Sequence, residues 1–503
     1  MIFSSVTFLV FFLPAVLVFY YCLPSRKWRN TILLLFSLFF YAWGEPKNIF
    51  LMILSIVFNF SMGIFIARKD GRKRKCLLAL SVFADFALLF VFKYLGFSCK
   101  IFNEILGALH SPVLAKINLA LPVGISFYTF QEVSYLVDVY RKSDSAEENI
   151  LDFALFVSFF PQLVAGPIVR YSSISSQISF RNESVQKFAY GARRFVIGLS
   201  KKILLANNFA FICDTIYSSS FSSYGTLISW LACFSYFFQI YFDFSGYSDM
   251  AIGLASLFGF SLPENFNYPY AAVSVSDFWR RWHMTLTGFF RDYLYIPLGG
   301  NRNGRLKTWR NRMAVFLATG IWHGAAFNFV FWGIFHGILT VLENILGLDK
   351  KKSVSCDFAG RGRRVKTVLT AVFRHALTLL FISLLWGLFR NGTKNSVKIL
   401  LKMFGLDYCI LLGGGAVSAG FDSMLILKVL NLKTLAVFFA GIFASFPWWK
   451  PVFSEFKKIN SPERILFSKI FFAARDCSLI LLLALCFSSL AGESYNPFIY
   501  FRF

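Results

Sequence analysis

The feature that most constrains the fold of this chain is its succession of long apolar segments with few charges. Residues 313–342 contain no Asp, Glu, Lys or Arg at all. About 20 such residues, wound into a helix, cross the hydrocarbon core of a bilayer. Further apolar runs lie near residues 5–23, 30–44, 48–67, 76–96, 367–389, 397–413, 433–448 and 477–492.

These runs predict an all-α fold, a polytopic integral membrane protein. Of the 503 residues, 57% are hydrophobic and only 15% are charged, which does not suit a string of soluble domains. We expect one transmembrane domain over residues 1–503, with its core motifs at about 118–345 and C-terminal helices over 367–492. Counting broken segments predicts roughly eleven to thirteen spanning or re-entrant helices.

The net charge of +25 is concentrated in short basic clusters between the apolar runs. The clusters lie at residues 26–29, 68–75, 302–312 and 350–366. The positive-inside rule produces such a placement, and anionic lipid headgroups add to the attraction. We therefore expect membrane lipids as partners, and no nucleic acid. The first two clusters predict cytoplasmic loops, which puts the N-terminus outside.

Sequence signals for metal or cofactor chemistry are absent. The nine cysteines show no CxxC spacing and are predicted to be packing residues, and the five histidines show no metal-ligand spacing. There is no Walker loop, HExxH, GxSxG or EF-hand loop. We expect no metal and no bound cofactor. The N-terminal run lacks a basic region and a cleavage site, so it predicts a retained helix rather than a signal peptide.

Two segments carry helix-breaking residues at membrane depth. Residues 118–140 contain Pro122 and Gly124, and the next run ends with Pro161, Gly166 and Pro167. Irregular backbone at this depth is tolerated only inside protein or beside a water-filled cavity. The second segment is therefore predicted to be broken or re-entrant.

Four charged residues also fall within apolar runs. Asp243 and Asp249 must each face a partner or a cavity, and the sequence does not choose between buried ion pairs and cavity lining. Asp85 and Lys93 share the fourth run. Either the two pair, or Lys93 extends to the membrane interface.

The segment 276–290 is predicted to be one amphipathic helix with Ser276 as its N-cap. Trp279 and His283, four residues apart, would share a face. Arg and aromatic residues together are typical of a helix at the lipid headgroups, which the residues alone slightly favour. The alternative is a face that contacts an anionic cofactor, such as the phosphates of coenzyme A.

His323 lies within the uncharged run 313–342, and is predicted to sit near the middle of the bilayer. A buried imidazole stays neutral and can accept a proton, as a general base must. The alternative is a hydrogen bond between helices. His336 falls on a different helix face and is predicted to lie near the opposite interface.

A series of motifs covers essentially the whole chain in a fixed order. They are MIFSSVTFLVFFLP, PVGISFYTFQ, FFPQLVAGPIVRY, YFDFSGYSDMAIGLASLFGF, PENFNYPY, SDFWRRWHMTL, YIPLGGNRNG, IWHGAAFNFVFWG and YNPFIYFRF. In these motifs the chain resembles the membrane-bound O-acyltransferase (MBOAT) family, in its alginate-acetylating branch that modifies bacterial polysaccharides. The teichoic acid D-alanyl transferases are a related branch.

The resemblance implies catalysis by two histidines that meet in a tunnel through the helix bundle. The family's essential histidine falls on His323 and its second polar position on His283. His323 would take a proton from the acceptor hydroxyl, and His283 or a Trp indole would stabilise the oxyanion. The residues expected to contact substrate are Trp279, Trp282, Arg280, Arg281, Asp243, Asp249, Arg302, Trp322 and Asn328, the three arginines through the donor's phosphates.

The resemblance also implies the setting of the reaction. A cytosolic thioester, acetyl-CoA, would donate the acetyl group, and an extracytoplasmic transferase or acceptor protein would complete O-acetylation of a surface polysaccharide. The location would be the bacterial inner membrane. Alternatives are D-alanyl transfer, a transporter, which should show internal repeats, and a lipid-binding scaffold, which would not need His323.

Overall fold

The structure, a computed structural model, is helical and contains no strand among the residues that it describes. These are residues 1–115, 117, 119–218, 225–349, 361–405, 429–448, 462–492, 496, 498 and 499. Within them, seven helices are long and apolar enough to cross a membrane. They are Asn48–Arg68, Gly71–Lys93, Val185–Ser218, Thr226–Leu257, Phe327–Ile345, Val368–Thr393 and Ile470–Gly492. The predicted all-α membrane architecture is confirmed.

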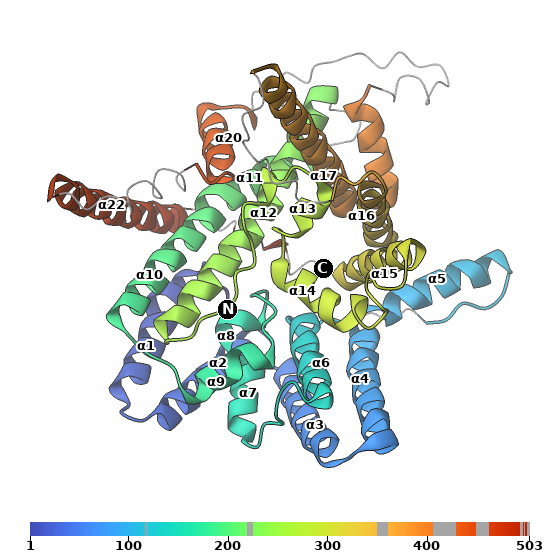
Figure 1. Ribbon diagram of the computed structural model, residues 1–503, viewed down its shortest axis with the longest axis vertical. Helices are drawn as coiled ribbons and strands as arrows, with labels where there is room; N and C mark the ends of the chain where they lie inside the picture. The colour runs from blue at the N-terminus through green and yellow to red at the C-terminus, as the bar shows by residue number, and fades with distance from the viewer. Residues whose placement is uncertain are drawn as a thin grey trace.

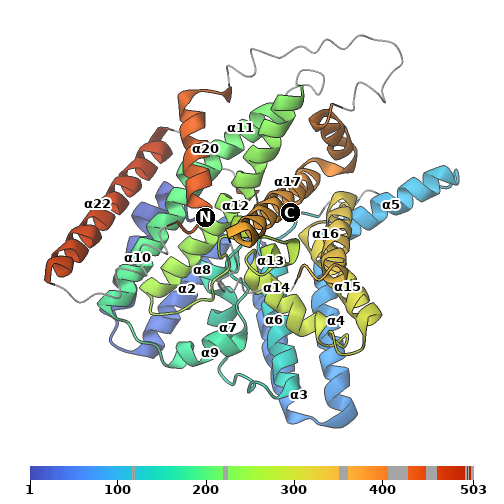
Figure 2. The same cartoon turned by 45° about the horizontal axis from the view of Figure 1, so that its top comes forward.

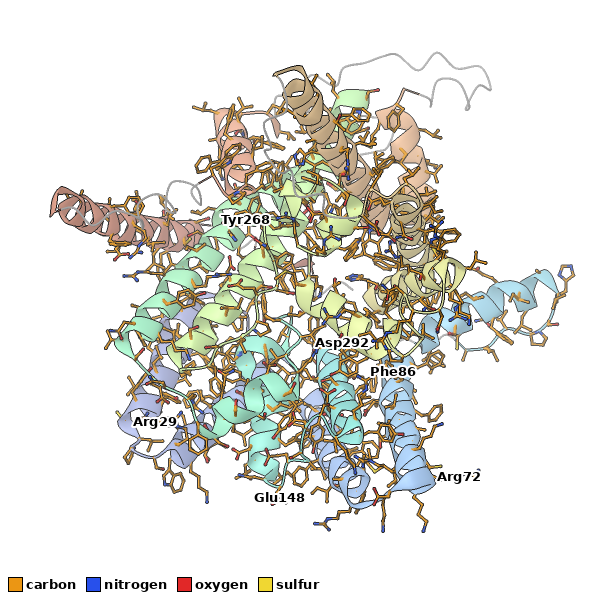
Figure 3. All side chains as sticks on the ribbon, viewed as in Figure 1. Arg29, Arg72, Phe86, Glu148, Tyr268 and Asp292 are labelled. Carbon is orange, nitrogen blue, oxygen red and sulfur yellow. The ribbon has the colours of Figure 1, made fainter. Side chains whose placement is uncertain are left out.

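The four N-terminal apolar runs form helices close to the predicted limits (Figure 1). These are the π-helical turn η1 (Thr7–Phe12) continued by α1 (Leu13–Cys22), then α2 (Arg26–Gly44), α3 (Asn48–Arg68) and α4 (Gly71–Lys93). Figure 3 shows Arg29 and Arg72 toward the same lower end of the bundle. The charge pattern predicts that these two basic clusters lie on the same side of the membrane.

Helix α5 (Leu95–Ala108) leaves the bundle directly after α4. It has no buried residue, and both views show it extending away from the other helices (Figures 1 and 2). Its base still contributes to the interior, since Gly96 and Phe97 line a cavity described below.

Of the two segments with helix breakers, the second is interrupted as predicted, and the first becomes helical only after its Pro and Gly. Helix α6 (Ile125–Arg141) starts only after Gly124, and the next run is divided into α7 (Ile150–Ser158), α8 (Phe160–Leu163) and α9 (Tyr171–Ser179). The irregular backbone between α8 and α9 is buried, and the Ile168 amide donates to Thr285 Oγ1 at 3.0 Å. Protein groups thus replace water there.

Helix α12 (Thr226–Leu257) is the central element of the bundle. It is buried along most of its length and packs against α10 (Val185–Ser200), the π-helical turn η2 (Lys201–Ala206) and α11 (Asn207–Ser218). A helix apolar on all sides belongs in the interior. The position of α12 between other helices is evident in Figure 2.

The segment 269–345 supplies the elements of the candidate site. They are η4 (Pro269–Ala271), α13 (Val275–Trp279), α14 (Met284–Phe290), the π-helical turn η5 (Arg291–Tyr295), α15 (Arg305–His323) and α16 (Phe327–Ile345). Helices α15 and α16 form a tight antiparallel hairpin. A Cβ added at Gly333 would lie 2.4 Å from the Phe316 carbonyl oxygen, so only glycine permits this approach.

The C-terminal helices are α17 (Arg361–Met403), α20 (Leu432–Ala444) and α22 (Pro462–Gly492). The runs 367–389 and 397–413 were predicted to be separate helices, and α17 joins them across a kink at Gly392 (φ 70°). Residues 350–360, 406–428 and 449–461 lie outside the described part, including much of two basic segments and the end of the second run. Helix α22 contacts α10 and is little buried.

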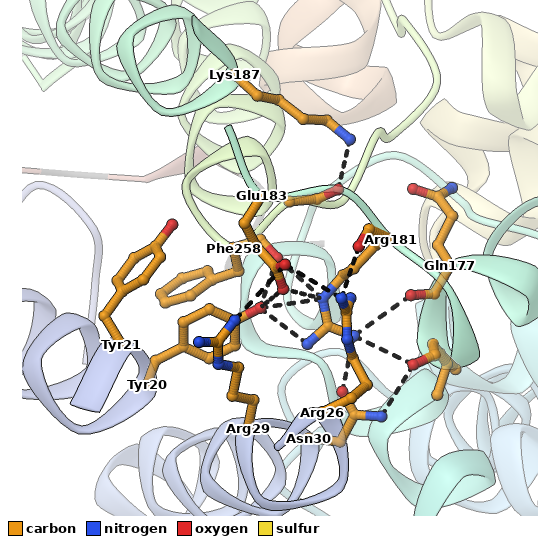
Figure 4. A network of polar contacts seen from close by, with 12 residues as sticks. Tyr20, Tyr21, Arg26, Arg29, Asn30, Gln177, Arg181, Glu183, Lys187 and Phe258 are labelled. Atoms are coloured by element: carbon orange, nitrogen blue, oxygen red, sulfur yellow. Dashed lines mark hydrogen bonds and ion pairs between the residues drawn. The ribbon is translucent and has the colours of Figure 1, made fainter. Parts of the chain in front are cut away.

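A network of charges joins α1, α2, the segment before α10 and the end of α12 (Figure 4). Glu183 accepts from Tyr20 Oη at 2.7 Å and pairs with Arg26 at 3.1 Å. Arg181 donates to the Phe258 carbonyl at 3.0 Å and to Asn30 at 2.7 Å. Because four separate segments share these partners, the network fixes one end of the bundle.

Candidate functional site

His323 is the last residue of α15. Gly324 is extended, and a Cβ there would lie 2.2 Å from the Phe329 ring, so the chain turns sharply at a glycine. The uncharged run 313–342 is thus a helical hairpin, and not the single helix that the sequence suggested. His323 is only 3% exposed, and it lies at the reversal of the hairpin.

Aromatic rings surround His323. The centroids of Trp322, Trp332 and Phe389 lie 4.9, 5.2 and 5.1 Å from the His323 ring. The reversal also brings His336 into this cluster, 4.7 Å from Trp332. His336 is fully buried, and it lies beside Trp332 rather than apart from His323 on another face of one continuous helix.

His283 reaches the same cluster from another element. The predicted continuous helix 276–290 is interrupted, because the Asn267 amide donates to the Arg281 carbonyl and the Met284 amide to that of Asn265. His283 therefore precedes α14 with a left-handed backbone (φ 42°). It shares no helix face with Trp279. Its ring lies 6.0 Å from that of Trp322, so Trp322 contacts both histidines.

The hydrogen bonds of Asn265 define the proton position on His283. Asn265 Oδ1 accepts from the Thr285 amide at 3.3 Å and from Thr285 Oγ1 at 2.9 Å, which identifies it as an acceptor. It lies 3.1 Å from His283 Nδ1, so that nitrogen carries the proton. Nε2 is then an acceptor, and it has no partner among the described residues.

The N-cap of α13 also differs from the prediction. Ser274 rather than Ser276 caps this helix, because the chain is extended at Ser274 and its Oγ accepts from the Asp277 amide at 3.0 Å. The Ser276 amide donates instead to Glu343 of α16 at 2.8 Å. This contact attaches α13 to the α15–α16 hairpin.

The tryptophans of the central segment line the interior. Trp279 and Trp282 are 6% and 1% exposed, so the predicted helix at the lipid headgroups is wrong for these side chains. Trp279 Nε1 donates to His336 Nδ1 at 3.2 Å, and the Trp282 ring lies 4.9 Å from that of Trp386. Asn328 is buried as well, and its Nδ2 donates to the Phe389 carbonyl at 2.9 Å.

Two cavities meet at Lys93. A small one, of about 50 Å³, is lined by Lys93, Ser126, Phe127, Val164, Trp322 and His323. A larger one, of about 1010 Å³, lies between α5, the reversal of the hairpin and the kink of α17, and its lining includes Lys93, Asn328 and Gly392. Lys93 is thus common to the cavity that His323 lines and to the larger cavity beside α5.

Lys93 itself was not expected in the site. Its Nζ donates to the Trp322 carbonyl at 2.5 Å and to Ser126 Oγ at 3.3 Å. Asp85 instead accepts from Asn59 Nδ2 at 2.9 Å. The pair with Asp85, one of the two alternatives offered by the sequence, is therefore wrong.

The two aspartates of α12 form buried ion pairs, which was one of the two alternatives. Asp243 lies 2.6 Å from Lys202 and accepts from the Ile499 amide at 2.7 Å. Asp249 lies 2.7 Å from Arg194 and 2.6 Å from Lys201. Both carboxylates contact cations of the α10–η2 segment, and neither lines the two cavities at Lys93.

The three candidate arginines for donor phosphates lie away from His323. Arg281 pairs with Asp277 at 2.9 Å, and Arg280 lies 3.5 Å from the same carboxylate. Arg302 is exposed on the loop before α15. Because α15 has 19 residues, Arg302 and His323 are separated by roughly 28 Å along the helix.

Sequence reasoning missed Lys93, Asn265, His336, Trp332 and Phe389 as neighbours of the two histidines. A lysine in an apolar run was an available signal, because a buried charge in a membrane is costly without a role. His336, in the uncharged run, was a second signal, but it was assigned to another helix face. The proximity of the other three depends on two chain reversals that periodicity does not reveal.

Comparisons with known proteins identify the family of this chain. Residues 35–348 match MBOAT, the membrane-bound O-acyltransferase family. The chain is 35% identical to the probable alginate O-acetylase AlgI of Pseudomonas putida, over 100% of both chains. It is 42% identical to that of Pseudomonas aeruginosa, over 69% of this chain and 67% of the relative. It is 37% identical to the peptidoglycan O-acetyltransferase of Helicobacter pylori, over 81% and 80%.

Proposed function

Because this chain belongs to the membrane-bound O-acyltransferase family, we propose that it transfers an acetyl group from acetyl-CoA for O-acetylation of a bacterial cell-surface polysaccharide. The chain is a multi-pass membrane O-acyltransferase, and the proposal adds the donor, the acceptor and the inner membrane as location. Similarity to alginate and peptidoglycan O-acetylating proteins supports a glycan acceptor. The observation that carries the mechanism is the convergence of His323 and His283 on Trp322 beside a cavity.

The proposed chemical step is attack of an acceptor hydroxyl on the thioester carbonyl. His323 takes the hydroxyl proton while the oxygen bonds to the carbonyl carbon, and the carbonyl electron pair moves onto its oxygen. When the carbonyl re-forms, the carbon–sulfur bond breaks and the thiolate leaves with the proton from His323. Atoms and charge are balanced without a metal or redox partner.

His283 has a supporting role in this scheme. Its Nε2 accepts hydrogen bonds, so it orients the attacking hydroxyl and does not donate to the oxyanion. Trp322 Nε1 is a buried donor without a partner among the described residues, and therefore suits the oxyanion better. The sequence offered His283 or a Trp indole as the donor to the oxyanion, and we retain the indole of Trp322.

The remaining candidate residues have roles at a distance from His323. We assign Arg280, Arg281 and Arg302 to donor binding at the cytoplasmic mouth, where exposed Arg302 is the most available of the three. Asp243 and Asp249 maintain the shape of the bundle through their ion pairs. An extracytoplasmic partner that receives the acetyl group would approach the large cavity next to α5.

The first prediction tests His323. We expect His323→Ala to reduce acetyl transfer by roughly 10²–10⁴-fold, the contribution of a positioned general base. The measurement is transfer of labelled acetyl from acetyl-CoA to the envelope fraction in membranes holding the protein. A matched control is His110→Asn, because His110 is exposed and has a left-handed backbone that Asn tolerates.

Three outcomes separate the alternatives. Loss of labelling in His323→Ala, with labelling retained in wild-type protein and in His110→Asn, supports the proposal. Equal labelling by wild-type protein and His323→Ala would show that His323 takes no part in the chemistry. No labelling by folded wild-type protein contradicts acetyl-CoA as donor and favours another acyl donor or transport.

A further inference from the structure

Lys93 places a positive charge in the small cavity that holds His323. It ends α4, and its Nζ contacts the Trp322 carbonyl at 2.5 Å and Ser126 Oγ at 3.3 Å. Both Lys93 and His323 line this cavity, and Lys93 lines the larger one as well. A group bound in the small cavity beside His323 therefore lies next to the ammonium as well.

The contacts of Lys93 within the described chain are all with neutral groups. Besides the carbonyl and the hydroxyl, its Nζ lies 5.6 Å from the centre of the Trp322 ring. None of the described carboxylates forms an ion pair with it. Lys100 and Glu104 line the large cavity too, but their opposite charges offset each other. Lys93 thus has no compensating carboxylate within the described chain.

A buried ammonium without a counter-ion is costly, and it is best compensated by an anion that forms during the reaction. An oxyanion is such a group. It develops on the acyl carbonyl oxygen as the acceptor oxygen bonds to the carbonyl carbon, and it disappears when the carbon–sulfur bond breaks. A fixed cation close to that oxygen stabilises the transition state more than the neutral thioester.

We propose that the ammonium of Lys93 stabilises the oxyanion formed beside His323, together with the indole N–H of Trp322. This inference rests on the proposed acyl transfer. It makes Lys93 a catalytic residue, one that sequence reasoning had assigned to pairing or to the membrane interface. His323 moves the proton, and Lys93 and Trp322 stabilise the charge.

A purely structural role for Lys93 makes different predictions. Its contact with the Trp322 carbonyl lies at the C-terminal end of α15, where a cation stabilises the helix. Tyr94 has the same kind of contact, since its Oη donates to the Ile321 carbonyl at 2.8 Å. Tyr94 does not line either cavity at Lys93. Removing the Tyr94 hydroxyl therefore weakens the end of α15 without changing the charge in the cavity.

The experiment compares Lys93→Met, Lys93→Arg and Tyr94→Phe in purified protein, by kcat, KM for acetyl-CoA and the midpoint of thermal unfolding. We expect Lys93→Met to lower kcat by roughly 10²–10³-fold, the effect of losing one oxyanion donor, with KM changed less than about threefold. Lys93→Arg retains the charge and should recover part of kcat. Tyr94→Phe should lower the midpoint but keep kcat within about threefold.

Each contrary result is distinguishable. Equal kcat losses in Lys93→Met and Tyr94→Phe, with equal shifts in the midpoint, would overturn the proposal in favour of a helix-end contact. If Lys93→Met does not fold, Lys93→Gln keeps the hydrogen bonds without the charge, and a full kcat in that variant overturns the proposal. Wild-type protein that transfers no acetyl group overturns the proposed function and this inference together.

Discussion

Asn265 selects which ring nitrogen of His283 carries a proton. Its Oδ1 accepts from both groups of Thr285, and its Nδ2 donates to Ser248 Oγ at 3.1 Å. The amide is therefore held in one orientation, and the proton on His283 Nδ1 follows from it. The acceptor nitrogen of His283 then faces the aromatic cluster rather than the loop.

Replacing Asn265 tests this arrangement. We expect Asn265→Ala to lower kcat by roughly 10–100-fold and to destabilise the protein by about 1–3 kcal/mol, because His283 Nδ1 and the Thr285 amide lose a buried acceptor. Steady-state kinetics and thermal unfolding in detergent check both effects. The exposed Asn303→Ala is the control. Unchanged kcat in Asn265→Ala would show that the proton position on His283 has no bearing on the reaction.

At the scale of single residues, the sequence predicted which two histidines belong to the site but not which groups they touch. His323 and His283 were singled out by their motifs, and both are nearly or fully inaccessible. The contact of Lys93 with the Trp322 carbonyl was not predicted, because the two residues lie more than two hundred positions apart in the chain. Local patterns contain no information on a contact with a distant backbone carbonyl.

Among the helices, the α15–α16 hairpin positions His323 through a close approach of the two helix backbones. A Cβ at Gly333 would lie 2.4 Å from the Phe316 carbonyl oxygen, and one at Gly320 would lie 2.4 Å from that of Phe329. Small residues at such crossings let helix backbones touch, which is how helices associate inside membranes.

We expect Gly333→Ala to force the two helices apart and to destabilise the protein by about 1–3 kcal/mol, the usual effect of overpacking. Acetyl transfer should fall as well, because His323 lies at the reversal of this hairpin. The control is Gly387→Ala, also within a helix, where a new Cβ would meet nothing within 4 Å. The midpoints of thermal unfolding of both variants test this prediction, and equal midpoints would contradict a tight crossing of α15 and α16.

Hydrophobic periodicity predicted the existence of the helices better than their ends. The early runs and the break near Pro161 agree with the structure, since length and proline act locally. The interruptions at His283 and Gly324 were missed, because each depends on tertiary contacts. The first needs the loop at Asn265, and the second needs the ring of Phe329.

Across the whole molecule, the ion pair of Lys202 and Asp243 connects α12 to η2 in the interior. Their side chains are 3% and 2% exposed, and the Ile499 amide is a further partner of Asp243. Removing one member of a buried pair is far more costly than removing both, because the remaining charge stays desolvated.

We therefore expect Asp243→Asn to destabilise the protein by about 3–5 kcal/mol, and the double variant Lys202→Met, Asp243→Leu to recover much of this loss. Asp70→Asn, at an 89% exposed side chain, should leave the midpoint unchanged. Thermal unfolding in detergent measures all three. If the double variant is less stable than Asp243→Asn, the ion pair contributes more to stability than the cost of burying its two charges.

Asn496 and Ile499 matter for how the protein is assembled in the cell. Asn496 Nδ2 donates to the Ser4 carbonyl at 2.9 Å, and Ile499 meets Asp243 deep in the bundle. The ribosome makes these residues after every helix that they contact. During synthesis the earlier helices therefore insert before Asp243 has its Ile499 partner, and the interior is complete only when this late segment has been added.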